Sequence, residues 1–267
     1  MLDNNDTVAI AVSGGKDSLS LLYIMKKIFN GRHRAPKLLA FTIDEGINGY
    51  RSESLKIAQS YCSKLAIPTK ILSYKEIFRI SMDDAMVSRP AERMSSCSMC
   101  GTLRRRAMDL AAESIGADVL ATAHNLDDYV QSFVINILAG DIERIGWSHP
   151  EPVQYASGKL KKIKPFVEIY EKEIVLYALQ RQIPFQSEEC PYMHESIRSE
   201  LRQFLNMLEK HHPGIKYNIY NTVSKISKMV KSGIEVPPIH KCSVCKRECS
   251  SAICAVCKTL NSLVVQD

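Results

Sequence analysis

The stretch Ser13–Ser18, Ser-Gly-Gly-Lys-Asp-Ser, constrains the fold of this chain more than any other. Apolar, largely β-branched residues at 7–12 precede it and predict a buried strand, while the apolar residues of 19–29 fall mostly on one helical face. The stretch is therefore a strand–loop–helix turn. Its two glycines let a ligand approach the backbone, and the helix directs free N–H groups and the positive end of its dipole at that ligand. With two serine hydroxyls and a lysine cation added, the loop favours a ligand that carries phosphate.

The spacing of this loop differs from that of a Walker A loop, which needs a glycine four residues before Gly-Lys-Ser/Thr. Here Asp17 stands where that motif has its hydroxyl. Ser-Gly-Gly-x-Asp-Ser resembles instead the pyrophosphate loop of the PP-loop ATP pyrophosphatases, which cleave ATP between the α and β phosphates and attach AMP to an oxygen of the substrate. The alternative, a glycine-rich turn without a ligand, does not explain why the motif is flanked by both a strand and a helix.

Composition sets the class of protein. A chain of 267 residues with 45% hydrophobic and 24% charged residues builds one sizeable core and a small appendage. No apolar run approaches the ~20 residues that span a bilayer, and the first residues lack a basic-then-apolar signal pattern, so we expect a cytoplasmic protein without a membrane partner. The net charge of +6 agrees with a polyanionic partner but does not identify one.

Strand patterns alternate with helix patterns along the first two thirds of the chain, which predicts an α/β fold with a doubly wound parallel sheet. Ligands of such sheets bind at the carboxyl ends of the strands. We expect further strands at 37–44, 69–74, 117–122 and 161–166, the last closing the sheet, and helices at 51–65, 76–87, 129–138 and 170–182, with one more beginning near Thr102.

The remaining segments are less regular. Residues 140–159, with the only tryptophan, Trp147, predict a long surface loop. The lysines around 159–164 form either a solvated strand face or part of a track for a phosphate backbone. Two helices are expected at 197–210 and 219–231, and Pro237-Pro238 marks a boundary. The predicted division is 1–190 for the nucleotide-binding domain, 191–236 for a helical extension and 237–267 for a cysteine-rich module.

Two carboxylates, Asp127 and Asp128, follow the strand expected at 117–122. At the carboxyl end of a strand they could hold Mg²⁺ or orient a phosphate. Acidic residues are equally favoured in the first turn of a helix, where they interact with the helix dipole. The sequence leaves both interpretations open.

Four cysteines near the end of the chain, Cys242, Cys245, Cys254 and Cys257, form two Cys-x-x-Cys pairs separated by eight residues. Four thiolates from two such turns suit a tetrahedral, structural zinc site. The module is too small to fold on an apolar core, so we expect the metal to stabilise it. Cys249, between the pairs, is interpreted as a bystander.

The pair Cys97 and Cys100 differs, because it stands alone at the entry to a helix, where the dipole favours a thiolate. Cys190 lies in another predicted loop. Three thiolates could hold a [4Fe-4S] cluster with one iron left open. They could instead act as a nucleophile and a resolving thiol in sulfur transfer, or be three unrelated buried cysteines.

Taken together, the motifs resemble those of the tRNA 2-thiouridine synthetases of the TtuA and archaeal NcsA type, in the wider TtcA/TtuA group of the PP-loop superfamily, which has an adenine nucleotide α-hydrolase-like fold. The terminal cysteine ribbon argues against TtcA itself. The matching stretches run in family order over almost the whole chain and are Ser13–Ser18, Cys97–Gly101, Thr122–Asp128, Glu189–Tyr192, Pro213–Lys216 and the ribbon.

The resemblance implies roles for individual residues. ATP would be held by Ala11, Ser13, Gly14, Gly15, Lys16, Asp17, Ser18, Arg104 and Ala123, with Ile43 beside the adenine. Cys97, Cys100 and Cys190 would ligate the [4Fe-4S] cluster, and Asp127 or Asp128 would serve adenylation with Mg²⁺. Two departures from the family pattern affect the nucleotide site: Arg104 stands where lysine is common, and Ala123 where glycine is usual.

The implied reaction is ATP-dependent: the C2 oxygen of a tRNA uridine is adenylated with release of pyrophosphate, and sulfur then replaces it with release of AMP. The wobble uridine, position 34, is the expected target. Position 54 and a cluster-free persulfide mechanism are the alternatives. The sulfur donor would be sulfide or a thiocarboxylated ubiquitin-like protein, and a homodimer is one implied assembly.

Overall fold

A six-stranded sheet organises the computed structural model, which describes residues 2–90, 94–146, 153–154, 160–193, 197–233 and 239–263. The strands stand in the order β3-β2-β1-β4-β6-β5, and all neighbours are parallel except β5 and β6. Their bounds are β1 Thr7–Ala11, β2 Lys37–Asp44, β3 Thr69–Ser73, β4 Val119–Ala121, β5 Val153–Gln154 and β6 Lys161–Ile163.

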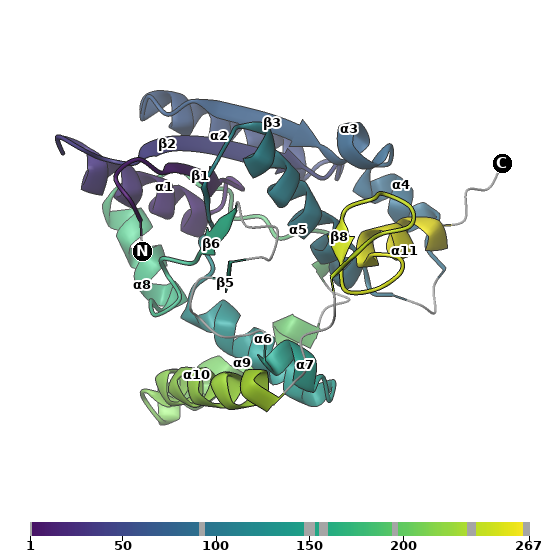
Figure 1. The fold of residues 1–267 in the computed structure, drawn as a ribbon. Helices are drawn as coiled ribbons and strands as arrows, with labels where there is room; N and C mark the ends of the chain where they lie inside the picture. The colour runs from purple at the N-terminus through teal and green to yellow at the C-terminus, as the bar shows by residue number, and fades with distance from the viewer. Residues whose placement is uncertain are drawn as a thin grey trace.

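Helices cover both faces of this sheet, as Figure 1 shows. Val8 and Ile10 of β1 point into a core shared with α1 and α8, whereas Ala9 points into a second core shared with α5. The predicted doubly wound α/β fold is confirmed. The helices are α1 Lys16–Phe29, α2 Arg51–Lys64, α3 Tyr74–Phe78, α4 Met82–Val87, α5 Ser96–Ser114, α6 Leu126–Leu138, α7 Ile142–Gly146, α8 Glu171–Gln180, α9 Ile197–His211, α10 Ile215–Gly233 and α11 Ala255–Ser262.

Two predictions about the helices between residues 74 and 114 were wrong. The single helix expected at 76–87 is two short helices, because Arg79 takes a left-handed conformation (φ 64°) and Ser81 caps a new start. The helix expected near Thr102 begins at Ser96, since the side chain of Ser95 accepts the N–H of Ser98. Cys97 therefore lies in the first turn of α5.

The sheet edge also differs from the prediction. The strand β6 does not close the sheet, because β5 pairs with it in antiparallel fashion. The segment expected to be an unstructured loop at 140–159 contains this strand and the helix α7. Trp147 and Lys159 lie outside the described residues.

The C-terminal elements attach at two places. The helices α9 and α10 pack on α6, and α10 also packs on α7. The ribbon contains the short strands β7 His240–Lys241 and β8 Glu248–Cys249, and its helix α11 packs on α5 (Figure 1). No described helix is both long and apolar enough to cross a membrane. The predicted boundary at Pro237-Pro238 lies outside the described residues, and the three-part division stays a prediction.

Candidate functional site

The loop between β1 and α1 is held by its own serines. The N–H of Ser13 donates to Ser18 Oγ (3.0 Å), and that hydroxyl donates in turn to the carbonyl of Gly15 (3.0 Å). The N–H of Gly15 reaches Ser13 Oγ at 3.3 Å, and the start of α1 has no side-chain cap. The first N–H groups of α1 are thus left to a ligand, as an anion site requires.

Gly14 is the one position of this loop where a side chain is excluded. Its φ is +88°, and a Cβ there would lie 2.3 Å from the carbonyl oxygen of Ser54 on α2. The backbones of the loop and of α2 can meet only because residue 14 has no side chain. Gly15, with an ordinary φ, faces no such obstacle.

Lys16 and Asp17 form an ion pair at the start of α1. Lys16 Nζ lies 3.0 Å from Asp17 Oδ2 and 2.7 Å from Glu171 Oε1 of α8. Burial alone would lower the pKa of Lys16, but the two carboxylates outweigh it and raise the pKa. Burial raises the pKa of Asp17, and its other oxygen, Oδ1, is buried without a hydrogen-bond partner among the described residues. Such an orphaned carboxylate oxygen fits a divalent cation.

The two carboxylates at the start of α6 have different surroundings. Asp127 is buried; its Oδ1 accepts from Lys216 Nζ of α10, and its Oδ2 accepts the N–H of Glu171 at 2.8 Å. Both oxygens are therefore used within the fold. Asp128 accepts the N–H of Asn125 at 3.2 Å in a capping box and also lines a small open pocket.

That pocket is lined by His124, Asp128, Tyr129, Ser132 and Lys164. Burial raises the pKa of Asp128. Desolvation by the surrounding protein, together with the cations Lys164 and Arg198, lowers the pKa of His124 to about 4, although part of the side chain is exposed. The imidazole is neutral at pH 7, and its Nδ1 lies 2.9 Å from Thr122 Oγ1. The pocket thus offers the carboxyl group of Asp128 and the neutral imidazole of His124.

The three loop cysteines come from two segments that the fold brings together. Cys97 and Cys100 lie in the first turns of α5, and Cys190 packs against the same core as Cys100. Hydrogen bonds from Ser96 Oγ (3.1 Å) and Cys97 Sγ (3.8 Å) to the carbonyl of Tyr192 hold the two segments together. Burial raises the pKa of Cys190, and the nearby Cys100 and Cys97 raise it further.

A charged network joins these cysteines to the loop. Arg104 donates to Cys100 Sγ (3.2 Å), and its Nε lies 2.9 Å from Glu45 Oε1. The other oxygen of Glu45 lies 2.7 Å from Arg51 Nε, and Arg51 donates to the carbonyl of Ser13 at 2.6 Å. Glu45 raises the pKa of Arg104 well above its usual value, so Arg104 stays a cation.

The segment that leads to Cys190 also touches the loop directly. The N–H of Gln186 donates to the carbonyl of Gly14 (3.1 Å), and its side-chain amide donates to the carbonyl of Tyr50 (3.0 Å). The glycine loop and the three cysteines therefore lie at the carboxyl ends of the parallel strands. Ala11 and Ile43 lie at the ends of β1 and β2, and Ala123 follows β4.

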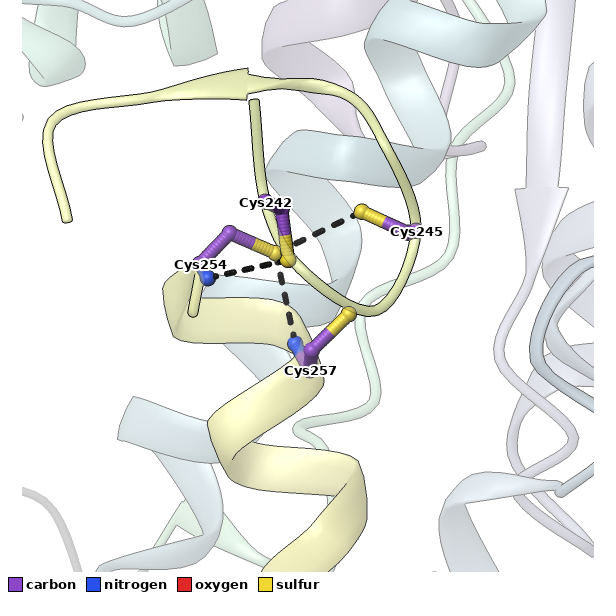
Figure 2. Close-up of side chains that lie close together, drawn as sticks. All are labelled: Cys242, Cys245, Cys254 and Cys257. Carbon is purple, nitrogen blue, oxygen red and sulfur yellow. Dashed lines mark hydrogen bonds between the residues drawn. The ribbon is translucent and has the colours of Figure 1, made fainter. Parts of the chain in front are cut away.

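The four terminal cysteines converge on one point. Their sulfurs all lie within 4.8 Å of one another, and Figure 2 shows the side chains pointing together. Backbone N–H groups of Cys254 and Cys245 lower the pKa of Cys242 to about 6, which favours a thiolate. Four thiols at this separation fit one tetrahedral zinc ion. Cys249 packs beside these cysteines but is not one of the four, and its thiol donates to the carbonyl of Ser251 (2.9 Å).

Over the described ranges, no second set of three or more metal-binding side chains reaches this closeness. Cys97, Cys100 and Cys190 are therefore spaced more widely than the ligands of a single tetrahedral ion. Three thiols from two segments are the kind of donor set that an iron–sulfur cluster with one open iron uses.

Comparison with known proteins places this site in a family. A family model described as a PP-loop domain matches residues 2–209. The chain belongs to the PP-loop family. A probable sulfurtransferase of Methanocaldococcus jannaschii is 33% identical over 271 residues, covering 98% of this chain and 76% of the relative. The tRNA 2-thiolation protein NcsA of Haloferax volcanii is 32% identical, covering 98% and 84%.

A eukaryotic relative and a solved structure agree with this assignment. Cytoplasmic tRNA 2-thiolation protein 1 of Danio rerio is 35% identical, covering 98% of this chain and 76% of the relative. The U34-tRNA thiolase NcsA from Methanococcus maripaludis, solved with its [4Fe-4S] cluster, has a TM-score of 0.83 at 30% identity, covering 100% of this chain and 84% of that one. The resemblance to the NcsA type is confirmed.

Several residues of the site were not singled out from the sequence. They are Glu45, Arg51, Glu171 and Lys216. Glu45 could have been found, because it directly follows the strand β2 at the edge where ligands of such sheets bind. Lys216 ends the matching stretch Pro213–Lys216, which marked it without giving it a role. Arg51 and Glu171 lie at helix starts, where charged residues are common, so only their contacts distinguish them.

Proposed function

We propose that this chain is an ATP-dependent tRNA uridine 2-sulfurtransferase that acts at position 34. The observation that carries the proposal is the placement of the phosphate loop and the three cysteines on one edge of the sheet, joined by Gln186 and by the Glu45 network. A site that both activates an oxygen and replaces it with sulfur needs these two parts side by side. The tRNA 2-thiolation proteins among the relatives support the assignment.

Activation of the uridine is the task of the loop. The C2 oxygen attacks the α phosphate of ATP, and pyrophosphate departs. The N–H groups at the start of α1 and the cation Lys16 stabilise the negative charge that develops on the phosphates. Lys16 is paired with Asp17 and Glu171 here, so phosphate binding would draw it from these carboxylates. Ala11, Ser13–Ser18, Ile43, Ala123 and Arg104 are the proposed nucleotide residues.

Asp128 is the better candidate of the two acidic residues for the adenylation step. Both oxygens of Asp127 are engaged by Lys216 and Glu171 inside the fold, whereas Asp128 lines an open pocket. Burial is the main cause of the raised pKa of Asp17, and the charge of the nearby Asp128 adds to it. We assign Asp17 and Asp128 as the residues that would hold Mg²⁺, which neutralises phosphate charge.

Replacement of the oxygen is the task of the cysteines. Cys97, Cys100 and Cys190 would hold a [4Fe-4S] cluster, whose fourth iron supplies a binding place for the transferred sulfur. Sulfur attacks C2 of the uridine, the C2–oxygen bond breaks, and AMP departs with that oxygen. Arg104 places a positive charge 3.2 Å from Cys100 Sγ. Cys97 is exposed, which leaves one side of the cysteine set open to the base.

The proposed partners follow from the reaction. The substrate is tRNA, and the donor is sulfide or a thiocarboxylated ubiquitin-like protein. The four terminal cysteines would hold a structural zinc ion. The Danio rerio relative named cytoplasmic supports a cytoplasmic location. A homodimer is proposed from the family resemblance, and light scattering of the purified protein tests it.

The experiment uses anaerobically reconstituted protein with ATP, unmodified tRNA and sulfide. We expect AMP and pyrophosphate to be released and 2-thiouridine to appear at position 34 by mass spectrometry of tRNA fragments. The variants Cys97→Ser, Cys100→Ser and Cys190→Ser lose iron and thiolation, whereas Cys249→Ser retains both. Thiolation by a protein that holds no iron would overturn the cluster mechanism, since sulfide would then attack C2 directly, and 2-thiouridine at position 54 would change the target.

A further inference from the structure

Glu45 occupies a central place between the two halves of the proposed site. It is 5% exposed, and its two carboxylate oxygens contact different guanidinium groups. Oε2 lies 2.7 Å from Arg51 Nε, and Oε1 lies 2.9 Å from Arg104 Nε. One buried anion therefore holds two cations that come from different helices, α2 and α5.

The backbone around Glu45 is held firmly. Its carbonyl accepts the N–H of Met82 at 2.7 Å, at the start of α4. The next residue, Gly46, has φ +69°, and a Cβ there would lie 2.7 Å from Ser81 Cβ. The turn after β2 therefore packs tightly against the start of α4, and the backbone that carries the Glu45 side chain has little freedom to move.

On the side of the phosphate loop, Arg51 is a buried side chain that makes several hydrogen bonds. It is 5% exposed and donates to the carbonyl of Ser13 (2.6 Å) and to the hydroxyls of Ser54 and Thr42 (2.9 Å each). It also donates to the carbonyl of Ile43 (2.9 Å). Arg51 therefore fixes the first residue of the phosphate loop relative to the ends of β1 and β2.

On the cysteine side, Arg104 is half exposed and depends on Glu45 for its direction. Besides Glu45, its described contact is Cys100 Sγ, at 3.2 Å. The sulfur also lies 3.6 Å from the hydroxyl of Tyr74, a fully buried side chain. A long, flexible arginine held at one end by a fixed carboxylate loses fewer orientations when it contacts the sulfur.

We propose that Glu45 is a positioning residue that sets Arg51 against the phosphate loop and Arg104 against Cys100, so that one carboxylate aligns both halves of the site. This inference rests on the proposed function for its meaning, but not for its geometry. Without the carboxylate, two guanidinium groups face each other with no anion between them. Arg104 would then turn toward solvent, and the hold on Ser13 would loosen.

The first test uses Glu45→Gln in protein that retains zinc but lacks the iron–sulfur cluster, without tRNA. The rates at which iodoacetamide alkylates Cys100 and Cys97 are measured separately by mass spectrometry, and Cys97 serves as an internal reference. Loss of a charge-assisted contact predicts a change of about tenfold in the ratio of the two rates. The affinity for ATP, measured by calorimetry, is expected to fall about tenfold because Arg51 is no longer fixed.

Matched variants separate position from general damage. Glu53→Gln removes an exposed carboxylate on α2, two residues after Arg51, and should leave both readouts at the wild-type values. Glu45→Asp keeps the charge and should bring the alkylation ratio and the ATP affinity part of the way back to the wild-type values. If Glu45→Gln does not fold, Arg104→Gln replaces a half-exposed side chain and should reproduce the change in alkylation. An unchanged ratio and an unchanged ATP affinity in a folded Glu45→Gln protein would overturn the proposal.

The outcome is distinct from that of the proposed function. The alkylation ratio and the ATP affinity need no iron, no sulfide and no tRNA. If the wild-type protein fails to thiolate tRNA while Glu45→Gln changes both readouts, the proposed thiolation is refuted and the positioning role of Glu45 stands. If the wild-type protein thiolates tRNA while Glu45→Gln changes neither readout, only the positioning role of Glu45 is refuted.

Discussion

At the scale of single residues, the site is shaped by what is missing as much as by what is present. Gly14 lacks the side chain that would clash with Ser54, and the buried Oδ1 of Asp17 has no hydrogen-bond partner within the part of the chain that the structure describes. The first absence lets the loop touch α2, and the second leaves a place for a cation. Both residues belong to the motif Ser13–Ser18, from which the nucleotide site was predicted.

Replacement of Gly14 by alanine is expected to destabilise the protein by about 2 kcal/mol or more and to abolish ATP binding. The new Cβ meets both an unfavourable φ and a backbone oxygen at 2.3 Å. Gly31→Ala is the matched control for φ alone, since φ there is +78° and nothing lies within 4 Å. Denaturant unfolding compares the two, and equal losses of stability would show that the contact with Ser54 is relieved by movement.

The low pKa of His124 predicts a pH dependence. The group is neutral in the folded protein down to about pH 4, whereas in the unfolded chain it takes up a proton near its ordinary value of about 6.5. The unfolded state therefore binds more protons between about pH 6.5 and 4, and stability falls as the pH is lowered through that window. Chemical denaturation of His124→Gln should show a flatter pH profile over the same window. A profile parallel to that of the wild type would contradict the assignment.

At the scale of elements, three helix starts meet around Asp127. The carboxylate at the start of α6 accepts the first N–H of α8 and the ammonium of Lys216 near the start of α10. Lys216 also donates to Asn206 Oδ1 of α9 (2.5 Å), and its N–H donates to Glu209 (2.9 Å). Because Glu171 of α8 contacts Lys16, the C-terminal helices are connected to the phosphate loop through this junction.

The variants Asp127→Asn and Asp128→Asn should therefore fail in different ways. Loss of the Asp127 charge leaves Lys216 buried without its counterion and is expected to cost about 3–5 kcal/mol of stability. Asp128→Asn keeps an acceptor for the N–H of Asn125 and should lose AMP formation with little change in stability. Asp141→Asn is the control, since its partner Arg144 is exposed and such pairs contribute less than about 1 kcal/mol. A stable, inactive Asp127→Asn protein would return the catalytic role to Asp127.

At the scale of the whole molecule, the ribbon is attached to the main domain rather than independent of it. Leu263 belongs to the core beneath α5, and Val256 and Leu260 pack against that core. Arg247 makes two hydrogen bonds to Glu113 of α5, at 3.2 and 2.9 Å. The ribbon therefore covers the helix that carries Cys97 and Cys100.

Removal of zinc should loosen the ribbon and weaken the main domain by a smaller amount. We expect one zinc per chain by metal analysis, and after chelation rapid proteolysis confined to residues 239–263 with a modest fall in melting temperature. The fall reflects lost packing of Leu263 against the core. Cys257→Ser should reproduce the effect, and Cys249→Ser should not. Unchanged proteolysis after complete loss of zinc would show that the ribbon folds without metal.

The fold class, the phosphate loop and the convergence of the four terminal cysteines could be predicted from the sequence alone. A strand followed by Ser13–Ser18 and an apolar helical face can be read locally, because hydrophobic period and glycine placement depend on near neighbours. The pairs in 242–257 lie close along the chain, so their spacing alone brings four sulfurs together. The same local patterns placed the strand at 37–44 correctly.

Only the tertiary structure decided how the site is assembled. The helix start at Ser96 and the break at Arg79 depend on caps that periodicity does not record. The distinction between Asp127 and Asp128 depends on Lys216, 89 residues away. The contact of Glu45 with Arg51 and Arg104 joins three elements that no spacing relates. Contacts between distant parts of a chain arise from the packing of whole elements, and that packing sets which charges meet.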